Sequence, residues 1–193
     1  AACPPKADLP LARLSRFLEL TGVAWELAPT FCRMKTGRYK TYGKNRTLRL
    51  KNFNYSQIRP YFVTVCVRDD RPVLHDGLAE DIILCLKELR GAHGFKLYAY
   101  CIMPDHVHLL LSPGDSGLSL SKIIQTFKSI TTRRYRADGA KSLLWQMYFY
   151  DHVIRKEEDL GNVAKYILEN PIRKGIVKDG QDYPFCGLVD SLG

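Results

Sequence analysis

The chain has 193 residues, of which 46% are hydrophobic, enough for the core of one domain with an appendage. No apolar run approaches the ~20 residues of a membrane span, so we expect no membrane partner. The formal net charge of +9 favours a nucleic-acid partner. Six cysteines without a C-x-x-C pair argue against a zinc ribbon and suit a reducing compartment, so we expect a cytoplasmic protein.

The excess positive charge lies in the N-terminal third of the chain. Residues 1–57 are interpreted as a basic extension with a short helix and a basic arm, and residues 58–193 as the main domain. The arm between residues 33 and 51 has eight basic residues, no acid and two interleaved tyrosines. Such a stretch can follow a phosphate backbone while its aromatics stack on bases; the alternative is a solvated arm without a defined register. Its candidate nucleic-acid contacts are Arg33, Lys35, Arg38, Lys40, Lys44, Arg46, Arg49 and Lys51.

Beyond residue 58 the hydrophobic periodicity predicts seven elements. They are a strand over 61–68, a helix over 78–93, strands over 96–102 and 107–112, a helix over 118–137, a strand over 146–155 and a helix over 159–170. This β-α-β-β-α-β order with a final helix predicts an α+β fold. We expect a ferredoxin-like antiparallel sheet with helices on one face, plus the C-terminal helix.

Two histidines stand two residues apart, one just before the strand predicted over 107–112 and one within it. Because side chains in a strand alternate between faces, His106 and His108 point the same way, while Val107, Leu109 and Leu111 point into the core. Two adjacent imidazoles can hold one metal ion. The alternative is that both histidines line a polar groove.

The final predicted helix places Tyr166 and Asn170 one turn apart, so that a phenol and an amide lie on one face. The alternative is an ordinary amphipathic tyrosine at the edge of the core. In that case Asn170 would be the residue that ends the helix before Pro171.

Four sequence blocks occur together in a recognisable order, and residues from about 58 to 188 resemble the REP-associated tyrosine transposases, a branch of the single-tyrosine HUH transposases. The blocks are Tyr61–Thr64, Met103–His108, Tyr150–Arg155 and Tyr166–Gly175. The resemblance implies that Tyr166 is the nucleophile and that His106, His108 and Asn170 bind the metal ion. It also implies that His152 and Arg155 contact DNA or support the site.

The same resemblance implies the reaction. Tyr166 would attack a phosphodiester of single-stranded or hairpin DNA to give a 5′-phosphotyrosine linkage and a free 3′ hydroxyl. The implied cofactor is Mg²⁺ or Mn²⁺, although imidazole ligands alone favour zinc, nickel or copper. A nucleoid-associated, bacterial-type protein is expected, and monomer and homodimer both stay open.

Two other functions stay open at this stage. One is a transposase-derived DNA-binding protein without catalysis, and the other is an RNA-binding ferredoxin-like module. Other His-x-His classes are disfavoured. A histidine-triad hydrolase needs a third histidine where Leu110 stands, and a metallo-beta-lactamase-like site needs an aspartate and a histidine where leucines follow. A two-tyrosine initiator needs a tyrosine neighbour that Tyr166 lacks.

Overall fold

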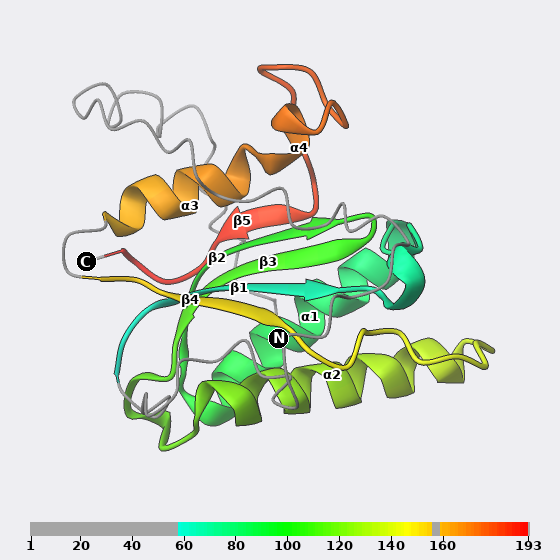
Figure 1. Ribbon diagram of the computed structural model, residues 1–193, viewed down its shortest axis with the longest axis horizontal. Helices are drawn as coiled ribbons and strands as arrows, with labels where there is room; N and C mark the ends of the chain where they lie inside the picture. The colour runs from blue at the N-terminus through cyan, green and yellow to red at the C-terminus, as the bar shows by residue number, and fades with distance from the viewer. Residues whose placement is uncertain (1–57, 156–158, 193) are drawn as a thin grey trace, which may run out of the picture. The chain divides into compact units, whose positions relative to one another are not determined.

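A five-stranded antiparallel sheet organises residues 58–155 and 159–192, the part of the chain that the computed structural model describes (Figure 1). The strand order is β4-β1-β3-β2-β5. In chain order the strands and α-helices are β1 (Tyr61–Cys66), α1 (Asp76–His93), β2 (Lys96–Met103), β3 (His106–Ser112), α2 (Leu120–Ala137), β4 (Tyr150–Val153), α3 (Leu160–Leu168), α4 (Asn170–Arg173) and β5 (Cys186–Leu188). The ferredoxin-like order is thus confirmed, whereas the predicted N-terminal helix and basic arm lie outside the described residues.

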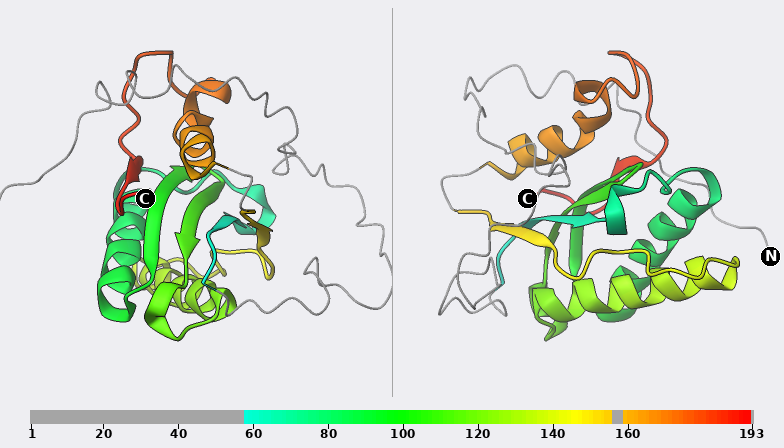
Figure 2. Two further views of the ribbon diagram at one scale, coloured as in Figure 1. Left: turned by 90° about the vertical axis from the view of Figure 1, so that its left-hand side faces the viewer. Right: turned by 45° about the vertical axis from the view of Figure 1, so that its right-hand side comes forward.

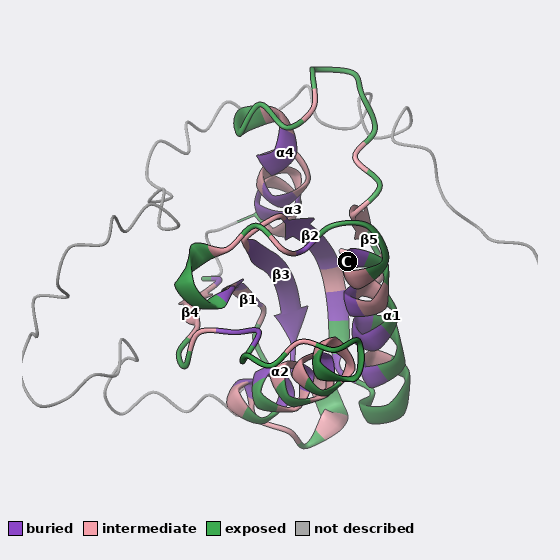
Figure 3. Cartoon of the chain, turned by 90° about the vertical axis from the view of Figure 1, so that its right-hand side faces the viewer, coloured by how far each residue is buried: buried purple, intermediate pink, exposed green. Residues whose placement is uncertain are grey.

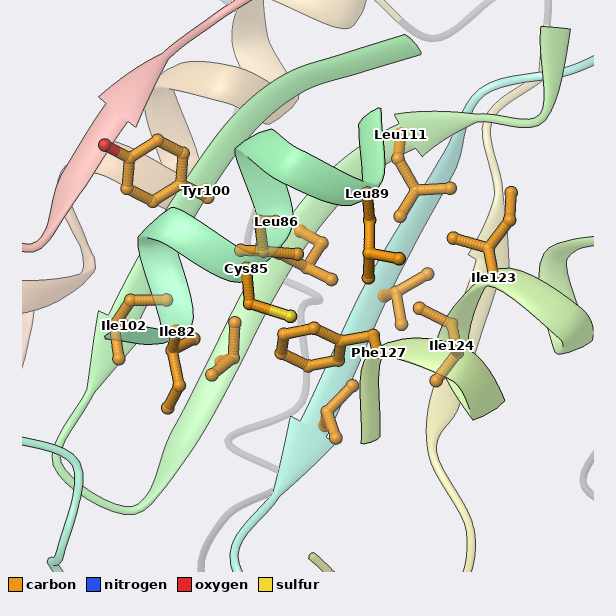
Figure 4. Close-up of a cluster of buried hydrophobic side chains, with 14 of the residues drawn as sticks. Ile82, Cys85, Leu86, Leu89, Tyr100, Ile102, Leu111, Ile123, Ile124 and Phe127 are labelled. Atoms are coloured by element: carbon orange, nitrogen blue, oxygen red, sulfur yellow. The ribbon is translucent and has the colours of Figure 1, made fainter. Parts of the chain in front are cut away.

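The larger core lies between one face of the sheet and helices α1 and α2. Figure 4 shows side chains of both helices meeting over the strands, among them Ile82 and Leu86 from α1 and Phe127 from α2. Val107, Leu109 and Leu111 of β3 are fully buried in this cluster, as their alternation with the histidines predicts. Helix α2 begins where Ser119 Oγ accepts a hydrogen bond from the backbone N–H of Lys122, a favourable N-cap.

The opposite face of the sheet carries α3 and a smaller core (Figure 2). Val163, Ala164 and Ile167 of this helix pack against β2 and β3, where Leu110 and Cys101 are fully buried. Strand β3 is therefore buried along its whole length (Figure 3). Any polar side chain on β3 consequently sits in an environment with little water. None of the described helices is long and apolar enough to cross a membrane.

The strand predicted over 146–155 is shorter in the structure, because its register with β1 is interrupted. Thr64 pairs with Tyr150, and Val67 forms an isolated bridge with Trp145. Between these two pairs the chain advances three residues on the β1 side, from Thr64 to Val67, but five on the other side, from Trp145 to Tyr150. The extra residues between Trp145 and Tyr150 bulge out of the sheet. Lys128 Nζ donates hydrogen bonds to the carbonyl oxygens of residues 146 and 147, which holds this bulge in place.

The last helix also differs from its prediction, since the helical path does not end at Asn170. A short helix, α4, begins at this residue and has Pro171 in its first turn. Proline fits there because the first backbone N–H groups of a helix have no partner within the helix. Strand β5 was not predicted.

The chain after β5 is fastened to α1 and β2 by one carboxylate. Asp190 Oδ2 accepts hydrogen bonds from Arg90 Nε at 2.7 Å and from the backbone N–H of Leu97 at 2.8 Å, and Arg90 Nη2 donates to Asp190 Oδ1. The hydrogen bonds from Arg90 hold the pKa of Asp190 below its usual value. Because the folded pKa is depressed, this stabilisation is present above the unfolded pKa of about 3.9 and is lost as the pH falls through the lower folded pKa.

We expect Asp190→Ala to lower the free energy of unfolding by about 1.5–3 kcal/mol at pH 7, because it leaves Arg90 and the Leu97 N–H without their acceptor. Thermal denaturation checks the effect. The difference from the parent protein should shrink as the pH falls below about 3.9, because the unfolded chain then binds a proton that the folded carboxylate resists. The exposed Asp179→Ala is the matched control and should leave Tm unchanged. An unchanged Tm for Asp190→Ala at pH 7 would contradict the assignment.

Candidate active site

Two buried histidines converge at the start of β3. His106 is 3% exposed and His108 is 8% exposed, and their Nε2 atoms lie 3.0 Å apart. The Nδ1 atom of each ring lies within hydrogen-bond distance of a side-chain oxygen. His106 Nδ1 lies 2.6 Å from Asp105 Oδ1, and His108 Nδ1 lies 2.9 Å from Thr64 Oγ1. When Nδ1 carries the ring proton and donates it to these oxygens, both Nε2 lone pairs point to one place.

This geometry suits a metal ion. Burial, followed by the nearby His106 and Arg173, lowers the pKa of His108 well below its usual value. His108 is therefore neutral at physiological pH, the form in which imidazole binds metals. Ligand atoms about 2.1 Å from one ion at adjacent octahedral positions lie about 3.0 Å apart, so the observed Nε2 separation of 3.0 Å fits that coordination.

Tyr166 lies beside the histidine pair on α3 and is half-buried. Its ring centroid is 6.5 Å from that of His108 and 6.0 Å from that of Phe62, in both cases edge to face. The guanidinium carbon of Arg173 stands 3.7 Å from the centroid of the Tyr166 ring, and Arg173 Nη2 donates to the Tyr166 backbone carbonyl at 3.3 Å. Tyr166 is thus positioned against the histidines of its own chain by contacts on several sides.

Asn170 is the fourth candidate residue and is 3% exposed. Its Nδ2 donates a hydrogen bond to the Tyr166 backbone carbonyl at 3.2 Å. Because the amide nitrogen of Asn170 donates this hydrogen bond to the helix backbone, Oδ1 is the Asn170 atom that could bind a metal ion. Among the described residues there is no group of three or more His, Cys, Asp or Glu side chains that could hold a metal ion.

Of the candidate DNA contacts near β4, His152 lies on the same face of the sheet as His108. His152 is directly opposite Phe62 across the β4–β1 pair, and Phe62 in turn stacks on His108 with ring centroids 5.2 Å apart. Arg155 is exposed beyond the end of β4. The eight candidate contacts between residues 33 and 51 lie outside the described residues.

The residues that orient the site were not predicted from the sequence. Thr64, Asp105 and Phe62 fall inside the motif blocks quoted above, but their roles depend on strand register and ring packing. Arg173 likewise belongs to the block after Tyr166, where its position one turn beyond Asn170 is the only signal.

An antiparallel ferredoxin-like sheet with paired histidines on a central strand and a tyrosine on the last long helix is the architecture of a single-tyrosine transposase. The family model described as "Transposase IS200 like" matches residues 55–170, which is more than half of the chain. The chain therefore belongs to this family of transposases.

Individual relatives agree with this assignment. A REP-associated tyrosine transposase from Escherichia coli K12 is 28% identical over 127 residues, covering 65% of this chain and 73% of the relative. A Haemophilus influenzae protein that is a candidate REP-associated tyrosine transposase is 28% identical over 142 residues, covering 66% of this chain and 78% of the relative. The solved structure of a REP-associated tyrosine transposase bound to a REP hairpin superimposes with a TM-score of 0.60 at 26% identity, covering 72% of this chain and 82% of that one.

Proposed function

We propose that this protein is a metal-dependent endonuclease and strand transferase that acts on single-stranded DNA next to hairpins. The observation that carries this proposal is the convergence of the His106 and His108 Nε2 atoms, 3.0 Å apart, with the Tyr166 ring packed beside them. A binding protein without catalysis has no need for two buried imidazoles whose Nδ1 atoms are both fixed by oxygen partners.

The reaction begins with attack of Tyr166 Oη on a DNA phosphorus atom. The phenolic proton is lost, the bond from phosphorus to the 3′ oxygen breaks, and that oxygen leaves as a 3′ hydroxyl after protonation. The 5′ phosphate stays on Tyr166 as a phosphotyrosine ester. A 3′ hydroxyl can attack this ester in reverse, which rejoins strands without an external energy source. The guanidinium carbon of Arg173 stands 3.7 Å from the centroid of the Tyr166 ring, so its positive charge would offset negative charge that develops on the phosphate during attack.

The metal ion would be held by His106, His108 and Asn170. It would polarise a non-bridging phosphate oxygen and offset the negative charge of the transition state. Mg²⁺ or Mn²⁺ is proposed because the resemblance to the transposase family implies these ions, and the Nε2 separation of 3.0 Å is compatible with octahedral coordination.

Hairpin DNA is the proposed partner because the solved relative is bound to a REP hairpin. On this chain, Arg173 beside the Tyr166 ring, His152 on β4 and the exposed Arg155 would contact DNA phosphates. The eight basic residues between 33 and 51 would extend the contact along the strand, and binding should then weaken steeply with salt.

Trapping of a covalent adduct tests the proposal. The full chain is incubated with labelled single-stranded DNA that contains hairpins, with Mn²⁺ or with EDTA, and resolved on a denaturing gel. Label should migrate with the protein only when metal is present, and peptide mapping should place the nucleotide on the peptide that contains Tyr166. An RNA hairpin of the same sequence should neither react nor compete. Tight DNA binding without any adduct would overturn the catalytic proposal in favour of a binding protein.

The role of Thr64 gives a separate prediction about metal affinity. Thr64→Val removes the oxygen that holds His108 Nδ1 but keeps the shape of the side chain. We expect the affinity for Mn²⁺ without DNA to fall by about 10- to 100-fold, because the imidazole loses its fixed orientation. Calorimetric titration measures it, and Thr64→Ser, which keeps the hydroxyl, should bind Mn²⁺ like the parent. Equal affinities in Thr64→Val and the parent would refute the role of this hydroxyl.

A further inference from the structure

Two cysteines lie directly opposite each other on neighbouring antiparallel strands. Cys101 of β2 pairs with Cys186 of β5. Strand β5 is the edge strand beside β2 (Figure 1). The next residue pair along the strands is joined by a hydrogen bond from Ile102 N to the Phe185 carbonyl at 2.8 Å. Since hydrogen-bonded and non-hydrogen-bonded pairs alternate, the two cysteines form a non-hydrogen-bonded pair. In such pairs the Cα atoms are about 4.5 Å apart, within the range that a disulfide spans.

The two thiols differ in exposure and acidity. Cys101 is fully buried, whereas Cys186 is half-buried near the C-terminal end of the chain. A hydrogen bond from Cys101 lowers the pKa of Cys186, against the opposing effect of burial. Both are free thiols in the structure. Cys186 is thus the more exposed thiol of the pair, and Cys101 lies directly opposite it on β2.

We propose that Cys101 and Cys186 are an oxidisable dithiol, a modification site that hydroperoxides convert into a cross-strand disulfide. The Cys186 thiolate attacks the peroxide oxygen, breaks the O–O bond and becomes a sulfenic acid while hydroxide leaves. The Cys101 thiol then attacks the Cys186 sulfur, and water leaves with the sulfenic oxygen. Two thiols and one molecule of hydrogen peroxide give one disulfide and two molecules of water. A dithiol reductant reverses the change by thiol–disulfide exchange.

The position of this pair gives the bond a structural effect. Strand β5 has only three residues, and the segment that leads to it from α4 is exposed at every position from 173 to 182 except Val177. A disulfide would fasten this weakly held edge to β2 and close a loop of about 85 residues in the unfolded chain. On the other side of β2, Cys101 pairs with His108, so the bond would form on the strand that neighbours the histidine pair.

Oxidation of the full chain tests the inference without any DNA, so its outcome is independent of the proposed transposase chemistry. The protein is treated with a few equivalents of hydrogen peroxide, its remaining thiols are blocked, and a non-reducing tryptic digest is mapped by mass. Trypsin separates the four described cysteines into different peptides. We expect a linked peptide that joins Cys101 to Cys186, two fewer titratable thiols, and a Tm raised by about 5 °C or more. Dithiothreitol should reverse all three changes.

Variants provide the controls. Cys186→Ser should give no linked peptide and no rise in Tm on oxidation, whereas Cys66→Ser should keep both, because Cys66 on β1 pairs with His106 and not with a cysteine. The inference is overturned if Cys186 accumulates as sulfinic acid while Cys101 stays a free thiol. It is equally overturned if Cys66 is oxidised and no link between Cys101 and Cys186 forms. If Cys186→Ser does not fold, the mapping of the parent protein decides the outcome.

Discussion

Tyr166→Phe is expected to form no covalent adduct with DNA and to cleave it at least about 1,000-fold more slowly than the parent, while it binds hairpin DNA with the parent's affinity. The substitution removes only the phenolic oxygen. The ring that packs against Phe62 and His108, 6.0 and 6.5 Å away between centroids, is kept, as is the face below Arg173. Fold and binding surface should therefore persist, and the loss should fall on the chemical step.

Single-turnover cleavage of labelled hairpin DNA measures the rate, and gel shift measures the binding. Tyr148→Phe is the matched control, because Tyr148 is 52% exposed in the bulge before β4 and makes no contact with the nucleophile that the structure records. It should cleave at the parent's rate. An adduct that survives in Tyr166→Phe would show that another residue is the nucleophile, and a parallel loss of hairpin binding would show a structural role for the hydroxyl.

The central part of the site could be predicted because it depends on local periodicity. The alternation of a strand is enough to put His106 and His108 on one face, and the helical repeat is enough to put Tyr166 and Asn170 one turn apart. How the rings are oriented could not be predicted in this way. The partner of His108 is Thr64, 44 positions earlier in the chain, and only the pairing of β1 with β3 brings the two together.

The parts of the fold that were not predicted from the sequence depend on tertiary contacts. Strand β5 has three residues, one of them Gly187, and shows no alternation because it is held by pairing with β2. The shortened β4 reflects a bulge that Lys128 stabilises from α2, a contact between residues 18 positions apart. The helical turn after Asn170 was missed because proline ends many helices, yet it is equally suited to the first turn of a new one.

His106→Ala is expected to lower the rate of strand cleavage by at least about 100-fold and to abolish the dependence on Mn²⁺ in the parent's concentration range. His106 tests the metal proposal more cleanly than His108, since His108 also stacks on Phe62 and its removal would disturb that packing. Asp105→Asn should give a smaller effect of about 10-fold or more, because it weakens the hydrogen bond that orients the His106 ring and removes a negative charge near His108.

Titration of cleavage rate against Mn²⁺ measures both variants, with the exposed His75→Ala as the matched control expected to behave like the parent. Mixing His106→Ala with Tyr166→Phe separates two modes of assembly. In the structure Tyr166 lies against His108 of the same chain. If the reaction uses this arrangement, the mixture should stay inactive. Recovered cleavage would mean that the tyrosine helix is exchanged between two subunits. A parent-like rate for His106→Ala alone would remove the metal from the proposed reaction and leave the paired histidines without a catalytic role.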